Sequence, residues 1–437
     1  MKLRPFELAL VIIFVILGVI ALFLLSTFDG SSKKDAENPL ALVGEVKIWG
    51  TMPAEGVDNF LRTQLELDDS FSQVSYSYFS PTEFDDALLR AIADGVGPDL
   101  LLVSQEKLVE MRRRIQPISY ESFPVRDIKD KYVDGAQIFA LSDGLYGFPI
   151  AVDPLMMYWN RDILATEGFL EAPRTWESLV NNMFPKLIKR NFDRTIKRSV
   201  VAMGEYGNVR NAFGVISALF IQGGSQRVIE DKNGTYLIKL QQAENDDSDP
   251  LRAAADFYTR FSKPSNTLYS WNRAFDQDRQ QFIAGDLALY FGYASEGVQI
   301  ERSNPNLNFD IAEIPQGSSA TKRRTYGRFY ALSLLRSSDN QAGAILLMQN
   351  LGGIDLSEKI AIASNMVPAQ RSWVTLGSND NFGRMSYQSA SIAVGWLNPN
   401  LVVADNIFRT MTQDINENRS DVSAATADAS SRLKNEY

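Results

Sequence analysis

The chain of 437 residues contains no histidine and no cysteine. Ordinary zinc sites, Ser-His-Asp and Cys-His nucleophile systems and thiol redox chemistry all require one of these two residues. Attachment to a membrane through a lipidated cysteine is excluded for the same reason. We therefore expect no metal ion, no cofactor and no catalytic residue of these kinds.

Basic residues are also outnumbered. The chain has 44 lysines and arginines against 53 aspartates and glutamates, which gives a formal net charge of −9. Nucleic-acid-binding proteins need basic patches that displace counterions from the phosphate backbone. The basic cluster at residues 112–114 is typical of a solvated helix end. We therefore expect no nucleic-acid partner.

One uncharged apolar run is long enough to cross a membrane. Residues 8–28 hold no charged side chain and, at about 1.5 Å per helical residue, span roughly the 30 Å of a bilayer core. Lys2 and Arg4 precede the run and favour a cytoplasmic N-terminus over residues 1–7. Residues 26–29 (STFD) lack a small-x-small cleavage pattern, so we predict an uncleaved single-pass signal anchor. A cleaved secretory signal is the alternative.

A polar stalk is expected between this anchor and the folded part. Residues 29–44 are polar and are broken by Gly30 and Pro39, which is typical of a flexible linker. About 390 residues follow, more than one hydrophobic core of about 250 to 300 residues accommodates. We therefore expect two lobes, placed outside the cytoplasm.

Short β-rich runs alternate with helical segments along this remaining chain. Strands are predicted over 45–49, 72–79 and 99–103, with helices after Pro53 and from Thr82. This alternation predicts an α/β fold. Further helices are expected to begin at Asn160 or Arg161 and at Asp249, and two more over 405–418 and 421–437.

Five ordered segments resemble the motifs of one family. Residues 97–100 (GPDL) resemble its G-x-P-D element, and 144–149 (GLYGFP) with 157–162 (MYWNRD) look like its Y-G-x-P and Y-Y-N-K-D block. Residues 171–179 (EAPRTWESL) resemble P-x-T-W-x-E-L, and 281–289 (QFIAGDLAL) resemble F-x-x-G-K-A-A-M. The chain therefore resembles the extracellular solute-binding proteins of ABC importers, of the sugar-binding type that includes maltose-binding protein. The resemblance covers nearly all of the chain beyond the stalk.

This resemblance implies a periplasmic-binding-protein-like fold, in which two α/β lobes close over a ligand like a Venus flytrap. The chain would cross between the lobes near residues 149–152, 329–331 and 368–371. Ligand that bridges both lobes only in the closed state shifts an open–closed equilibrium, which a membrane partner can detect. Lobe 1 would comprise residues 45–149 and 331–368, and lobe 2 residues 150–330 and 369–437.

Five residues are candidate ligand contacts, because sugar sites combine aromatic faces with fixed carboxylates and amides. Trp49 ends the first predicted strand, where ligands of open α/β sheets gather. By resemblance, Asp153 stands at the position of a ligand-bonding acid, and Tyr293 and Trp396 lie where the family places aromatic platforms. Trp271 is a further aromatic candidate. The alternative is core packing for each aromatic residue and a cap or turn for Asp153.

We expect a carbohydrate-binding subunit, held at the cell membrane by its anchor, that delivers its ligand to an ABC permease. Val103 replaces a sugar-stacking aromatic of maltose-binding protein, and Glu106 and Lys107 stand near its acid–arginine pair, which argues against maltodextrin as the ligand. A binder of a peptide, polyamine or other polar metabolite, acting in import or sensing, is the alternative. A two-carboxylate glycosidase needs a geometry that sequence cannot show. We therefore expect no enzyme.

Overall fold

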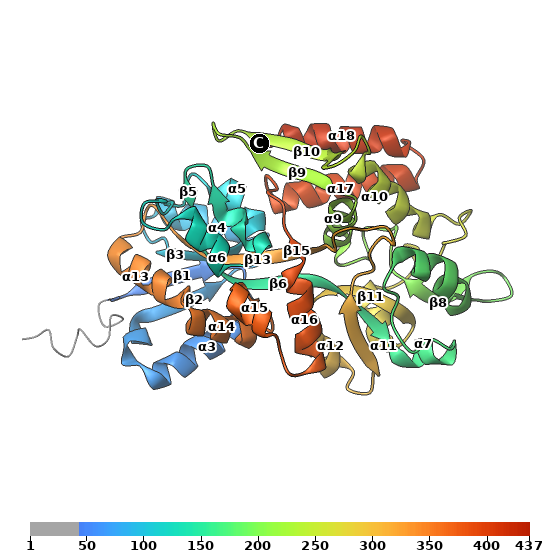
Figure 1. Cartoon of the computed structure of the whole chain (residues 1–437), viewed down its shortest axis with the longest axis horizontal. Coiled ribbons are helices and arrows are strands. Elements are labelled where there is room, and N and C mark those ends of the chain that lie inside the picture. Colours follow the sequence, from blue (N-terminus) through green and yellow to red (C-terminus); the bar gives the residue numbers. More distant parts are fainter. Residues whose placement is uncertain (1–42) are drawn as a thin grey trace, which may run out of the picture.

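The computed structural model describes residues 43–437 (Figure 1). The predicted anchor over 8–28, the cytoplasmic segment before it and most of the predicted stalk lie outside the described residues. Among the residues that are described, no helix is long and apolar enough to cross a bilayer.

One sheet runs through the described chain in the strand order β2-β1-β3-β13-β6-β11-β8-β7, with β12 and β14 paired to β6 and β15 paired to β13. At one end β1 pairs in parallel with β2 and β3, and at the other end β11 pairs in parallel with β8. We call β2-β1-β3 the first half-sheet and β11-β8-β7 the second. The strands are β1 (Val46–Gly50), β2 (Val74–Tyr78), β3 (Leu100–Ser104), β6 (Phe148–Asn160), β7 (Lys189–Arg190), β8 (Ile196–Val201), β11 (Leu287–Tyr293), β12 (Phe309–Glu313), β13 (Thr325–Leu334), β14 (Val367–Pro368) and β15 (Ala393–Val394).

Two long strands, β6 and β13, connect the half-sheets and run across the middle of the molecule in Figure 1. All 13 residues of β6 are buried. Its first part pairs with β13 and β14, and its second part pairs with β11 and β12. Ile150 is an extra residue in β6, because Tyr330 lies opposite Ala151 whereas Ala331 lies opposite Pro149. Such a bulge bends a strand where the chain passes from one half-sheet to the other.

The crossing segments expected near 149–152, 329–331 and 368–371 fall on β6, on β13 and at β14. The lobe boundaries drawn from them stay a prediction. Two β-hairpins lie outside the main sheet, and both flank the cavity described below. They are β4 (Ala140–Leu141) with β5 (Gly144–Leu145), and β9 (Ser225–Glu230) with β10 (Tyr236–Ala243).

Amphipathic helices cover the first half-sheet. In α3 the buried residues Val57, Phe60 and Gln64 recur at helical spacing, so one stripe faces the core. In α4, Phe84 and Leu88 are four residues apart and both are buried, so they lie on the same side of the helix. The helices of the chain up to β6 are α3 (Ala54–Leu67), α4 (Phe84–Ala93), α5 (Leu108–Met111) and α6 (Val125–Lys131); α13 (Gln341–Leu351) and α14 (Ile354–Ala363) follow β13.

Two predicted helix starts in the second half are confirmed by their caps. The Asn160 side chain accepts a hydrogen bond from the Ile163 N–H, and Asp249 accepts one from Arg252 with Pro250 following it. The remaining helices are α7 (Arg161–Thr166), α8 (Phe184–Leu187), α9 (Ala212–Gln222), α10 (Pro250–Thr259), α11 (Asp278–Ala284), α12 (Gly297–Ser303), α15 (Arg371–Leu376), α16 (Asn381–Ser391), α17 (Leu401–Asn416) and α18 (Val422–Lys434).

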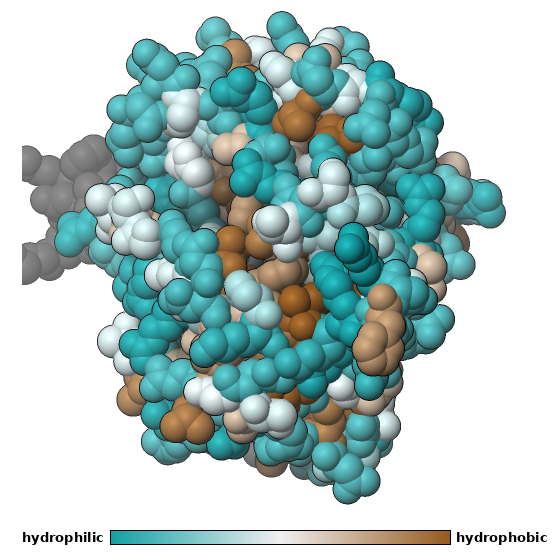
Figure 2. All heavy atoms as spheres, turned by 90° about the vertical axis from the view of Figure 1, so that its right-hand side faces the viewer, coloured by the Kyte–Doolittle hydropathy of each residue, from teal (hydrophilic) through white to brown (hydrophobic). Residues whose placement is uncertain are grey.

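The chain ends in the two predicted helices, α17 and α18, which pack against each other and lie behind the β9–β10 hairpin in Figure 1. Helix α17 begins at Leu401, four residues before the predicted 405, because Asn400 caps it with a hydrogen bond from Val403 N–H. Figure 2 shows the end of the second half as a mostly hydrophilic surface, with hydrophobic side chains gathered near its middle.

Candidate functional site

The carboxyl ends of strands from both half-sheets meet at the crossing strands. Strand β3 ends at Ser104 in the first half, and β11 ends at Tyr293 in the second. Ligands of open α/β sheets bind beyond such strand ends. The side chains that meet there are polar or charged, and we call them the junction cluster. It comprises Glu106, Asp153, Tyr293, Tyr326 and Arg328.

Glu106 connects the first half to the crossing strand β13. It follows β3 in a short 3-10 turn and is 2 % exposed. The Tyr326 hydroxyl donates a hydrogen bond of 2.6 Å to one carboxylate oxygen of Glu106. The other oxygen lies 3.4 Å from Nε of Arg328, an ion pair whose geometry does not make a hydrogen bond. A charge buried at this depth needs such partners.

Tyr293 presents its ring to the same arginine from the second half. The Arg328 guanidinium carbon lies 4.0 Å from the centre of the Tyr293 ring, which is a cation–π contact. The Tyr293 hydroxyl is buried, and no residue in the described part of the chain hydrogen-bonds to it. It points at α9, where Gly214 leaves it space: a Cβ at that position would lie 2.5 Å from the hydroxyl oxygen. A buried hydroxyl without a partner is unusual in a folded protein.

Asp153 lies on β6, directly opposite Arg328 in the strand pairing. Its carboxylate accepts hydrogen bonds from the Ser295 N–H at 2.9 Å and the Ser295 hydroxyl at 2.7 Å. Burial raises the pKa of Asp153 to about 6, although Ser295 and Arg328 both favour the charged form. Asp153 is therefore a carboxyl group that titrates close to neutral pH at the junction of the halves.

Glu296 fixes the end of β11 so that Tyr293 and Ser295 face the crossing strands. Its carboxylate accepts hydrogen bonds from the backbone N–H of Tyr293, from the amide of Asn211 and from the hydroxyl of Tyr290. These bonds join β11, the residue before α9 and the short turn that follows β11, all in the second half. The geometry of the junction cluster is therefore set by a buried network behind it.

Two of the five predicted ligand residues, Asp153 and Tyr293, are brought together in this cluster. Trp49 is placed elsewhere: its half-buried ring lies 4.5 Å from the ring of Phe79, which in turn contacts Phe84 of α4. Trp271 is fully buried, stacks on Phe275 and donates a hydrogen bond of 3.0 Å to Asn208. The contacts of Trp271 are those of a core residue, whereas Trp49 packs on an aromatic neighbour and stays partly accessible.

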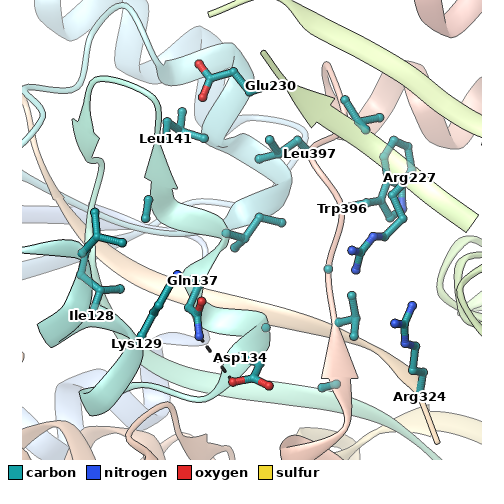
Figure 3. A pocket seen from close by; sticks show the side chains of 18 of the residues that line it. Ile128, Lys129, Asp134, Gln137, Leu141, Arg227, Glu230, Arg324, Trp396 and Leu397 are labelled. Carbon is teal, nitrogen blue, oxygen red and sulfur yellow. Dashed lines mark hydrogen bonds between the residues drawn. The ribbon is translucent and has the colours of Figure 1, made fainter. Parts of the chain in front are cut away.

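Trp396 lies next to a large cavity on the opposite side of the crossing strands. Its ring is buried against Phe213 and Phe408 and donates a hydrogen bond to Ser217. The segment 391–397 that carries it lines a cavity of about 1010 Å³ (Figure 3). The other wall is formed by the chain between α5 and β6.

This cavity and the junction cluster lie on opposite faces of β13. Side chains alternate along a strand, so Phe329 points away from the face that carries Tyr326 and Arg328. Gly135 lines the cavity, and a Cβ on it would lie 2.2 Å from the Phe329 ring. At the rim, Arg112 pairs with Glu230 at 2.5 Å, so it holds the β9–β10 hairpin and is not the solvated side chain that its sequence suggests.

The sequence prediction did not select Glu106, Tyr326 or Arg328 as site residues. Arg328 is the only charged residue in the strand TYGRFYALSL, and tyrosines stand two residues before and after it. This alternation places one charge and two hydroxyls on a single face of a buried strand, which is the signal that identifies the site. Lys107, the neighbour of Glu106, turns into the first half instead and contacts Asp85 and Glu110.

Solved structures with the same fold are found among sugar-binding proteins. A cyclo/maltodextrin-binding protein complexed with maltotetraose matches with a TM-score of 0.69 and 16 % identity, over 90 % of this chain and 97 % of that one. The sugar-binding protein MalE from Xanthomonas citri matches with a TM-score of 0.68 and 18 % identity, over 90 % of this chain and 97 % of that one. The periplasmic-binding-protein fold expected from the motifs is therefore confirmed.

Among curated proteins, a putative binding protein of Brucella abortus is 20 % identical over 293 residues. The match covers 64 % of this chain and 64 % of that relative, so the chain spans less than two thirds of the relative's length. The profile of the bacterial extracellular solute-binding proteins matches residues 72–353, which is more than half of the chain. The chain therefore belongs to the bacterial extracellular solute-binding protein family, whose members bind solutes and are not enzymes.

Proposed function

We propose that this protein captures a sugar or oligosaccharide at the junction cluster and delivers it to an ABC permease. The observation that carries the proposal is the meeting of charged and aromatic side chains from both halves at the strand ends. Charged residues are almost never fully buried unless they are paired, so their concentration where the halves meet sets this region apart from an ordinary apolar core. The similar fold of a protein complexed with maltotetraose adds support for this class of ligand.

The contacts in the cluster are of the kind that a sugar can replace. Carboxylates such as Glu106 and Asp153 accept hydrogen bonds from hydroxyl groups, and the face of Tyr293 covers C–H patches. Arg328 now covers that face at 4.0 Å, so a sugar that stacks on Tyr293 must displace the guanidinium. The Tyr293 hydroxyl would gain a partner from the ligand. Ligand and protein therefore compete for the same surfaces, which links binding to the separation of the halves.

Delivery to a membrane permease is compatible with the predicted anchor over residues 8–28. A tether holds the binding domain close to a membrane partner and raises its effective concentration there. We expect the soluble part to lie outside the cytoplasm, as the family name indicates.

The proposal is tested by isothermal titration of the full-length protein against a panel of mono- and oligosaccharides, with peptides and polyamines as the other arm. Tyr293→Phe removes the buried hydroxyl, and we expect it to weaken sugar binding by roughly fivefold to tenfold, the value of one hydrogen bond. Tyr132→Phe is the matched control, because Tyr132 also has a buried hydroxyl without a partner in the described chain but lies outside the junction cluster.

Equal sugar affinities of the Tyr293→Phe and Tyr132→Phe variants would place the ligand away from Tyr293. Binding of a polyamine or peptide in place of every sugar would change the ligand class. Absence of binding by the whole panel at millimolar concentration would remove the support for solute capture at this cluster.

A further inference from the structure

The cavity on the Phe329 face of β13 has walls of unusual charge. Its lining contains six basic residues and three acidic ones, in a chain with a net charge of −9. An excess of positive charge in an acidic protein calls for a local explanation. The charged lining residues are Lys129, Asp134, Arg227, Glu230, Asp231, Lys232, Lys322, Arg323 and Arg324.

Most of the acidic residues of the lining are already paired, and so are two of the arginines. Asp134 pairs with Arg371 at 2.7 Å and Glu230 with Arg112, and neither arginine lines the cavity. Arg323 pairs with Glu313 at 2.8 Å, and Arg324 pairs with Glu244 at 3.1 Å. The Asp231 carboxylate accepts backbone hydrogen bonds of its own turn.

Four cations of the lining have no ion pair and no side-chain hydrogen bond within the described residues. They are Lys129, Arg227, Lys232 and Lys322. The three lysines are exposed, so water satisfies them. Arg227 is different, because it is only partly exposed and an arginine carries five N–H donors. Burial lowers the pKa of Arg227 and the nearby Arg324 lowers it further, whereas Glu244 raises it.

The backbone at Arg227 is in a strained conformation. Its φ angle is +65°, a left-handed conformation that is rare for a residue other than glycine, asparagine or aspartate. It stands beside an irregularity of the β9–β10 hairpin: Arg227 pairs with Lys239, whereas Ser225, two residues away, pairs with Ala243. Such irregularities re-aim side chains next to functional sites, where backbone strain also gathers.

Figure 3 shows how the labelled side chains lie. Arg227 and Arg324 lie on one side of the cavity near Trp396, and Lys129 lies across it with Asp134 and Gln137. Gln137 donates a hydrogen bond to Asp134, so one polar wall faces the two arginines. The cavity measures about 1010 Å³, which is room for a ligand larger than a single ion.

We propose that this cavity binds a small anion with two or more carboxylate or phosphate groups, held by Arg227 with Lys322 on one wall and Lys129 on the other. Arginine bonds to carboxylate and phosphate in a bidentate manner, which suits an unpaired guanidinium. The site is separate from the proposed sugar site, because β13 lies between them.

The test is isothermal titration of the full-length protein with citrate and, separately, with inorganic pyrophosphate, at constant ionic strength. We expect binding of at least one of the two anions. Arg227→Gln should weaken it roughly tenfold or more, since a charged hydrogen-bonding group is lost, and the exposed Lys322→Gln should weaken it severalfold. Binding of citrate would indicate a carboxylate ligand, and binding of pyrophosphate would indicate a phosphate ligand.

Arg323→Gln is the matched control. It removes the same single charge from the same lining, but from a residue already paired with Glu313. We expect its affinity to stay within about twofold of the unmodified protein, because its guanidinium is already neutralised. Equal losses in the Arg227 and Arg323 variants would indicate general electrostatic attraction and would overturn the proposal.

Two further results would also overturn it. One is the absence of measurable binding of either anion up to about 10 mM, which corresponds to less than about 3 kcal/mol of binding free energy. The other is a loss of anion binding in Arg328→Ala with full binding in Arg227→Gln, which would place the anion at the junction cluster. Sugar binding at that cluster is measured separately, so either proposal can fail without the other.

Discussion

Replacement of Asp153 by asparagine tests whether the junction cluster holds a carboxyl group with a raised pKa. Asp153 is 2 % exposed, and burial raises its pKa from 3.8 to about 6. In the unfolded chain the carboxyl ionises near pH 4, whereas in the folded protein it keeps its proton up to about pH 6. Between these values the folded state binds one more proton than the unfolded state. The free energy of unfolding therefore falls as the pH rises.

The size of this effect follows from the two pKa values. Each pKa unit corresponds to 1.36 kcal/mol, so the step from 3.8 to about 6 amounts to about 3 kcal/mol. An asparagine side chain cannot ionise, so Asp153→Asn should lack this contribution. Relative to the unmodified protein, the variant should gain about 2 kcal/mol of unfolding free energy between pH 4 and pH 6.5, because the rest of the step lies below pH 4, and the difference should then stay nearly constant. Any loss of hydrogen bonding to Ser295 shifts the whole curve and leaves this slope unchanged.

The measurement is urea unfolding followed by tryptophan fluorescence at half-unit steps between pH 4 and pH 8. Asp278→Asn is the comparison, because burial raises the pKa of Asp278 to about 7. The difference in unfolding free energy between Asp278→Asn and the unmodified protein should keep rising between pH 6.5 and pH 7.5, where that of Asp153→Asn is nearly flat. A difference for Asp153→Asn that does not change with pH would refute the raised pKa and with it the buried junction.

Three other substitutions test separate parts of the structure. Trp271→Ala should lower the unfolding free energy by about 3 to 5 kcal/mol in urea titration, because the buried ring packs on Phe275, and should leave sugar affinity unchanged. A loss of affinity with unchanged stability would show that Trp271 binds ligand. Asn400→Ala should cost about 1 kcal/mol by loss of the α17 cap, and an unchanged melting temperature would contradict that cap. Gly135→Ala should cost roughly 1 to 3 kcal/mol, since its Cβ would meet the Phe329 ring at 2.2 Å, and full stability would show that the ring can move.

The elements of the first half could be predicted closely because each is defined by local signals. The strand expected over 45–49 is Val46–Gly50, and the strand expected over 99–103 is Leu100–Ser104. Their apolar runs are bounded by turn residues, so pattern and structure agree. Helix α4 shows the limit of periodicity: Leu88 is buried, but the equally apolar Leu89 next to it is 43 % exposed, because only a narrow stripe of the helix faces the core.

The candidate site was harder to predict because it depends on contacts between distant segments. Asp153 and Tyr293 were selected by resemblance to the family, and they meet only because β6 and β11 pair in antiparallel fashion. Trp49 was selected because it ends a strand, but the sequence does not show which face of the sheet its ring covers. The tryptophans were selected for their chemistry, and in Trp271 the surrounding packing determines the position of the ring.

The arrangement of both proposed sites follows from the register of β13. Arg328 and Phe329 are neighbours in sequence, yet one faces the junction cluster and the other faces the cavity beside Gly135. A slip by one residue would exchange these faces and force the charged side chain against a glycine that leaves no room for it. Pairing with β3, β6 and β15 prevents such a slip, because three strands fix the same register. The register of this one strand therefore keeps the proposed sugar site and the proposed anion site on opposite faces.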